Sequence, residues 1–220
     1  MGEVGDLPRF LCNARRPLHS VFVDLKSDVM NSRIKLFTRV IVFLCALAII
    51  PSMYVAVWQI QLEAPQYPEG LKMEIWCDHI GGDIDKINGL NHYIGMAQIK
   101  EENFPEFKVM KWLIWAMVVL AIAAAVVGRR FMLWILSGYL ILCGIWGIYD
   151  FWKWEYEYGH NLDPHAAIKI PGMAYQPPLF GWKQLLNFLA GSFPDVGGWL
   201  IIGPAAVIVA LTLYEQIRKK

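Results

Sequence analysis

The chain has 220 residues, of which 56% are hydrophobic, and a formal net charge of +1. Soluble domains contain about 45–50% apolar residues, so this excess, which is concentrated in a few runs, indicates a membrane protein. A charge so close to zero provides no electrostatic footprint for nucleic acid, and no nucleic-acid partner is expected. The four cysteines form no CxxC pair, and two of them lie inside apolar runs, which argues against a disulfide framework.

Four apolar runs have roughly the length of about 20 residues that a bilayer requires. The predicted spans are residues 34–60, 109–128, 131–152 and 199–215. Pro51 is expected to kink the first span, because proline cannot donate a helical hydrogen bond, and Trp58 is expected to mark its interfacial end. Residues 129–130 are short enough to make the second and third spans a helical hairpin. The sequence therefore predicts an all-α membrane protein, built as a four-transmembrane-helix bundle.

The basic residues predict the orientation. The N-terminal segment 1–33, the Arg129–Arg130 turn and the tail 216–220 are all basic, and basic segments are retained in the cytoplasm. We therefore expect a multi-pass protein of the cell inner membrane, without a cleavable signal peptide, with both termini in the cytoplasm. Residues 61–108 and 153–198 then form two outer segments, which face the periplasm in a Gram-negative source.

The outer segments are predicted to be mostly irregular and to pack together as one small outer subdomain, because neither has enough apolar residues for a core of its own. A short strand is possible over Lys72–Cys77 and a short helix over Asp85–Met96, although Gly89 and Gly95 weaken that helix. The stretch Phe180–Phe193 is amphipathic and is predicted to lie on the membrane surface.

Four of the five histidines fall on the outer segments, together with several methionines. Imidazole and thioether groups together suit a soft metal, above all Cu(I). His92 and Met96 are four residues apart, a spacing that places two side chains on one helix face. The candidate Cu(I) ligands are His92, Met96, His160, His165 and Met173.

Simpler interpretations compete with this metal site. The histidines of a surface loop face water in most proteins, and Met96 would serve equally well as core filler. Cys77 is the only cysteine of the outer segments and is expected to be a free thiol or a metal ligand. No CxxCH, P-loop, GxSxG or HExxH motif is present, and no histidine or acidic residue lies deep in a predicted span. We therefore expect neither haem chemistry nor proton-coupled transport.

Two groups of residues carry a resemblance to a known family. The segments Ile87–Met96 and Asp163–Met173, the latter followed by Tyr175–Leu179, resemble small multi-span membrane proteins of bacterial nitrous oxide reductase gene clusters. The resemblance covers about half the chain. It implies an accessory role in the maturation or electron supply of a periplasmic copper enzyme, and it makes the five candidate ligands copper candidates.

Two non-enzymatic functions follow as the main hypotheses. A third, a membrane oxidoreductase or quinol-handling subunit, is disfavoured because the predicted spans carry no cofactor ligands. The first is a membrane accessory protein that binds or hands over Cu(I) on the outer face and assists a periplasmic copper enzyme such as nitrous oxide reductase. The alternative is a metal-free structural or docking subunit of a membrane complex. Its outer segments, rich in proline and tyrosine, would then contact a periplasmic or membrane protein partner.

Overall fold

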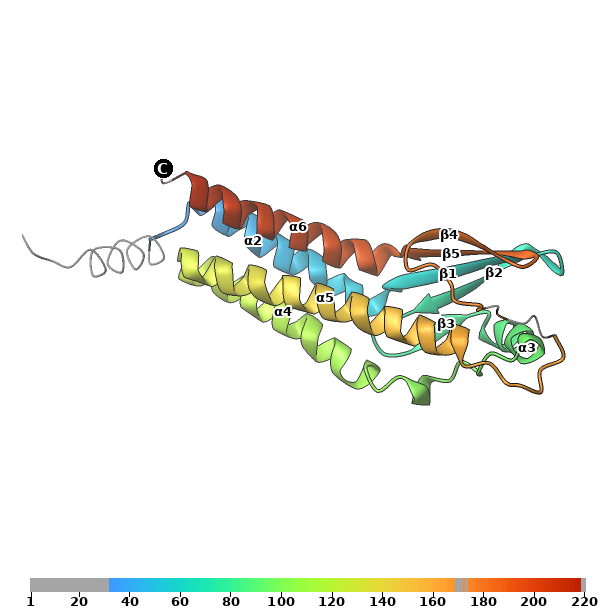
Figure 1. The fold of residues 1–220 in the computed structure, drawn as a ribbon. Coiled ribbons are helices and arrows are strands. Elements are labelled where there is room, and N and C mark those ends of the chain that lie inside the picture. The colour runs from blue at the N-terminus through green and yellow to red at the C-terminus, as the bar shows by residue number, and fades with distance from the viewer. Residues whose placement is uncertain (1–31, 169–171, 173, 219–220) are drawn as a thin grey trace, which may run out of the picture.

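The computed structural model describes residues 32–168, 172 and 174–218. Four long helices form a bundle, and a sheet stands at one end of it (Figure 1). The helices are α2 (Leu36–Ile49), extended by the 3₁₀ helix η2 (Ile50–Tyr54), α4 (Phe107–Val127), α5 (Arg130–His160) and α6 (Val196–Ile217). Within the described residues these four are long and apolar enough to cross a membrane, which is compatible with a multi-pass membrane protein.

The all-α prediction is wrong, because the outer segments form a five-stranded antiparallel sheet in the part of the chain that the structure describes. Its order is β3-β2-β1-β5-β4. The strands are β1 (Trp58–Ala64), β2 (Tyr67–Ile75), β3 (Ile80–Gly82), β4 (Gly181–Leu185) and β5 (Phe188–Pro194). The first three come from one outer segment and the last two from the other. The two segments therefore fold together through the pairing of β1 with β5.

Two boundaries account for the difference between the predicted and the observed fold. The first span ends at Tyr54 and not at residue 60, because Pro51 opens the 3₁₀ turn that closes the helix. From Trp58 the sequence alternates apolar residues with glutamines, which is the period of a strand with one buried face. Most of the amphipathic stretch Phe180–Phe193 folds into the β4–β5 hairpin, through the turn between Leu185 and Phe188.

One face of the sheet carries the core of the outer domain, by which we mean β1–β5, α3 (Ile84–Ile94) and the outer end of α5. Ile60, Leu71 and Met73 project from this face and are at most 3% exposed. They pack with Ile87 of α3 and with Ile99, which precedes the 3₁₀ helix η3 (Glu101–Asn103). The helix and the sheet thus bury a common apolar layer.

Helix α5 connects the bundle to this core. Its 31 residues span roughly 46 Å, whereas the hydrocarbon core of a bilayer is about 30 Å thick. The helix therefore extends beyond a membrane span and continues past residue 152, the predicted end of the third span, to His160. Phe151, Trp154 and Tyr158, spaced three and four residues apart, pack against the core of the outer domain.

The opposite end of the bundle carries Arg33, Arg129 and Arg130. Arg33 forms an isolated bridge with Arg129, and the Ile34 amide donates to the Gly128 carbonyl at 2.9 Å. The start of α2, the α4–α5 turn and the C-terminal end of α6 all lie at this end, away from the sheet (Figure 1). The positive-inside rule predicts that an end with these basic residues faces the cytoplasm.

Reporter fusions test this orientation. Fusions after Gly82 and Gly172 should report an outer location, and fusions after Arg130 and Lys220 a cytoplasmic one, because basic residues resist translocation. Activity of a periplasm-specific reporter after Arg130 would contradict the orientation.

Candidate functional site

The structure separates His92 from Met96. Helix α3 ends at Ile94, and Gly95 follows in the left-handed conformation with φ of 80°. The chain turns there, so the two residues do not share one helix face. His92 is exposed and lines a shallow hollow on the outer side of α3. Met96 is half-buried and lines a different cavity, beneath the sheet.

The second outer segment presents its histidines to solvent. His160 is the last residue of α5, where its ring stacks on Tyr156 at 3.9 Å and its Nδ1 lies 2.9 Å from the Tyr156 carbonyl oxygen. His165 is exposed in the following loop, and its backbone amide donates to the Asp163 carboxylate at 2.7 Å. Met173 lies outside the described residues.

The two candidate segments do touch, but through their backbones. The Asp163 amide donates to the Gly95 carbonyl at 2.8 Å, and the Ile168 amide donates to the Tyr93 carbonyl at 2.9 Å. Over the described residues, no three side chains of the His, Cys, Asp or Glu types are grouped so that they would hold a metal ion. A shared site that combines all the predicted histidines is therefore not assembled by the residues described.

The cavity that Met96 lines lies between the inner face of the sheet, α3 and the outer end of α5. Its volume is about 50 Å³, which is enough for a bound ion or a few water molecules. Most of its wall is apolar. The groups that are not hydrocarbon are Met73, Asn91, Met96, Trp154, Glu155, Tyr158 and Tyr175.

Three of these residues carry buried polar atoms for which the described residues supply no hydrogen-bond partner: both carboxyl oxygens of Glu155, the Tyr175 hydroxyl and the Trp154 indole nitrogen. Glu155 is 0% exposed and Tyr175 is 2% exposed. Native proteins pair more than nine in ten of their buried polar groups. These three groups line one cavity, where a water molecule, an ion or another polar ligand would satisfy them.

Backbone packing fixes the position of these groups. The Tyr175 amide donates to the Gly159 carbonyl at 2.9 Å. A Cβ atom at position 159 would lie only 2.5 Å from the Gln176 amide nitrogen, so only glycine lets the Tyr175 segment approach α5 this closely. Tyr175 thereby forms part of the cavity wall.

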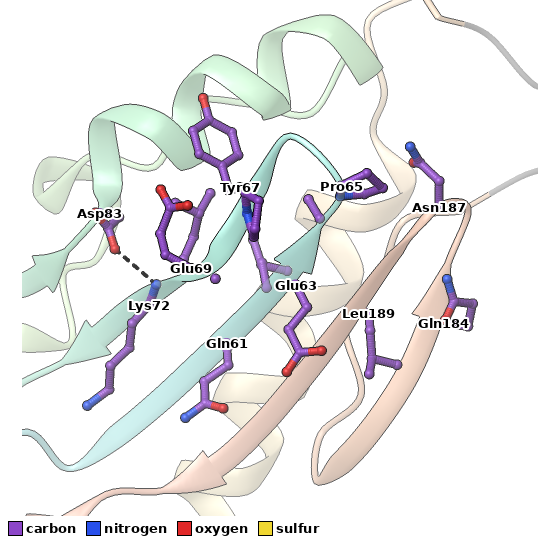
Figure 2. Close-up of a pocket in the computed structure, with 15 residues that line it drawn as sticks. Gln61, Glu63, Pro65, Tyr67, Glu69, Lys72, Asp83, Gln184, Asn187 and Leu189 are labelled. Atoms are coloured by element: carbon purple, nitrogen blue, oxygen red, sulfur yellow. Dashed lines mark hydrogen bonds between the residues drawn. The ribbon is translucent and has the colours of Figure 1, made fainter.

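A wider hollow opens on the face of the sheet that points away from the Glu155 cavity (Figure 2). It lies between the β1–β2 turn and the β4–β5 turn, and its lining includes Glu63, Glu69 and Lys72. The Lys72 ammonium is paired with Glu74 at 2.9 Å and with Asp195 at 3.0 Å. These hydrogen bonds outweigh its partial burial and raise the pKa of Lys72. The hollow is thus wide and polar, unlike the cavity around Glu155.

Cys77 forms no disulfide with another described cysteine and is fully buried. Its Sγ lies 3.4 Å from the Met53 carbonyl oxygen, at the junction of the bundle and the outer domain. Burial raises the pKa of the Cys77 thiol, so the reactive thiolate is scarce at neutral pH.

Cys77 should therefore resist labelling while the protein is folded. In a variant whose other three cysteines are replaced by serine, a membrane-impermeant maleimide should modify Cys77 only after denaturation. Rapid labelling of the folded protein would contradict this burial.

No protein-family model, curated protein or solved structure matches this chain. The sequence and the geometry of the outer domain are therefore the only basis for a function.

Proposed function

We propose that this protein is a membrane-anchored accessory protein whose outer domain binds Cu(I) and hands it to a copper enzyme on the same side of the membrane. It acts as a carrier and not as an enzyme. The observation that carries this proposal is the pair of thioethers, Met73 and Met96, that line the cavity containing the unpartnered buried groups. Thioether sulfur is a soft ligand that favours Cu(I) over zinc and the hard cations.

The two methionines come from different parts of the fold, and it is the folding of the outer domain that brings both to one cavity. Met73 is on β2 and 2% exposed, and Met96 follows the turn at Gly95. The resemblance of Ile87–Met96 to proteins of nitrous oxide reductase gene clusters supports a copper enzyme as the recipient. The exposed His92, His160 and His165 then have the role of entry or exit ligands, because exposed imidazoles exchange metal readily.

A metal-free docking subunit is the second candidate. It is favoured by the free edges of the sheet, where β3 and β4 each have a single neighbouring strand among the described residues. An unpaired strand edge accepts an extended segment of a partner protein by backbone hydrogen bonds.

Metal loading of the full-length protein in detergent separates the two candidates. After anaerobic reconstitution and desalting, we expect about one Cu(I) per chain. Met96→Leu should lower the Cu(I) affinity by about 10-fold or more, because leucine keeps the volume of the side chain and removes the sulfur. Met117→Leu, a change at a buried methionine of the bundle, is the matched control and should not alter it. A wild-type protein that retains no Cu(I) would leave the docking subunit as the better proposal.

A further inference from the structure

We infer that Glu155 is the anionic ligand of the cavity and makes it selective for a monovalent soft cation. This inference rests on the proposed function and adds the charge of the bound ion and the residue that sets it. Glu155 is not one of the candidate ligands predicted from the sequence, and its carboxyl group has no hydrogen-bonding role among the described residues of the outer domain.

The first step of the argument is the isolation of the carboxyl group. Glu155 is 0% exposed, and both of its oxygens lack a hydrogen-bond partner among the described residues. The nearby Lys183 is exposed, and its ammonium donates to the Gln176 carbonyl at 3.0 Å. An ionised carboxylate buried here would carry a large free-energy cost, so without a bound cation the group holds a proton instead. A cation inside the cavity would replace that proton.

The second step concerns the charge of that cation. One carboxylate together with one monovalent ion forms a neutral pair, which a low-dielectric interior tolerates. A divalent ion would leave one net positive charge buried, and the described wall of the cavity provides no second acidic residue. The thioethers of Met73 and Met96 select a soft ion, and the single carboxylate selects one positive charge. Cu(I) meets both conditions.

The third step concerns the aromatic residues around the cavity. Trp154 packs on Phe104, Phe151 and Tyr158 with ring centroids 5.0–5.8 Å apart. The faces of tryptophan and tyrosine rings attract cations. The hydroxyl oxygen of Tyr175, which has no partner among the described residues, is an additional neutral ligand. The cavity therefore provides one anionic group, two soft sulfurs and a neutral oxygen.

The residue two positions further along α5 offers a matched control. Glu157 is exposed and pairs with Lys153 at 3.8 Å. Glu155→Gln and Glu157→Gln make the same chemical change on the same helix, one inside the cavity and one in water. Glutamine keeps the shape of the side chain and removes the charge.

The experiment measures Cu(I) affinity of the full-length protein in detergent by competition with a chromogenic Cu(I) chelator. Glu155→Gln should lower the affinity by about 10-fold or more, while Glu157→Gln should leave it within about twofold of wild type. Thermal unfolding without metal checks that both variants fold. Unchanged affinity in a folded Glu155→Gln variant would overturn the inference and leave the proposed function standing, whereas a wild-type protein without Cu(I) affinity would end both.

A second measurement needs no variant. Ag(I) and Cd(II) are both soft, but they differ in charge. We expect Ag(I) to raise the thermal unfolding midpoint of the wild-type protein and Cd(II) to leave it nearly unchanged. An equal or larger rise with Cd(II) would overturn the selectivity for a single charge.

Discussion

Replacing Glu215 with leucine should destabilise the helical bundle by about 3–5 kcal/mol. Glu215 is 1% exposed on α6, and its Oε1 accepts hydrogen bonds from the Thr38 hydroxyl at 2.6 Å and the Lys35 amide at 3.3 Å. Its other oxygen lies 3.7 Å from Arg130 Nη2. Arg130 is itself only 5% exposed. Loss of the carboxylate would leave a buried guanidinium without a counter-charge, and thermal or denaturant unfolding in detergent would measure the cost.

A double variant separates the buried charge from simple packing. Arg130→Met combined with Glu215→Leu removes both charges and should recover most of the stability that Glu215→Leu loses, because a buried pair often tolerates apolar replacement. If the double variant were as unstable as the sum of the two single variants, the two residues would not be coupled, and the ion pair would have no role in the bundle.

The second large effect is expected at Gly198, where α6 leaves the sheet. A Cβ atom at this position would overlap the Val57 carbonyl oxygen and lie 2.9 Å from Pro194 Cβ. The Asp195 amide also donates to the Val57 carbonyl, at 3.1 Å. Gly198→Ala should therefore lower the free energy of unfolding by about 1–3 kcal/mol, the usual range for overpacking.

Gly144 of α5 provides the matched control. No described residue would come within 4 Å of a Cβ atom at this position, so Gly144→Ala should be neutral or should stabilise α5 by up to about 1 kcal/mol. Equal unfolding midpoints for Gly198→Ala and Gly144→Ala would show that the outer domain is not held to the bundle by this close approach.

Each of the four predicted spans coincides with a long apolar helix, because an apolar run of about 20 residues has the length of a bilayer crossing. The sequence predicts the outer domain poorly, because strands are short and their pairing joins distant segments. Trp58 is an example, since a tryptophan at the end of an apolar run has the pattern of an interfacial anchor. In the structure it starts β1, and its indole nitrogen donates to Ser192 in β5 at 2.8 Å. That partner is 134 residues away, and nothing in the local sequence indicates it.

The candidate site is predicted only in part. Met96 does line a cavity, but His92 does not share it. The i, i+4 argument requires a helix that continues through Gly95, whereas this glycine ends it. Glu155 escapes prediction because a third span that stops at residue 152 leaves it in a loop. The spacing of Phe151, Trp154 and Tyr158 does contain a signal, since apolar residues three and four apart indicate a helix face. Glu155 lies next to that face.

X-ray absorption spectroscopy of the Cu(I)-loaded, full-length protein is the most direct test of a copper site in this cavity. Two thioether ligands and one carboxylate predict a first coordination shell that contains sulfur and oxygen, without the multiple-scattering pattern of imidazole. Met96→Leu should remove sulfur from that shell. A first coordination shell made only of imidazole nitrogen would contradict a copper site in this cavity. The copper would then lie on the exposed His92, His160 or His165.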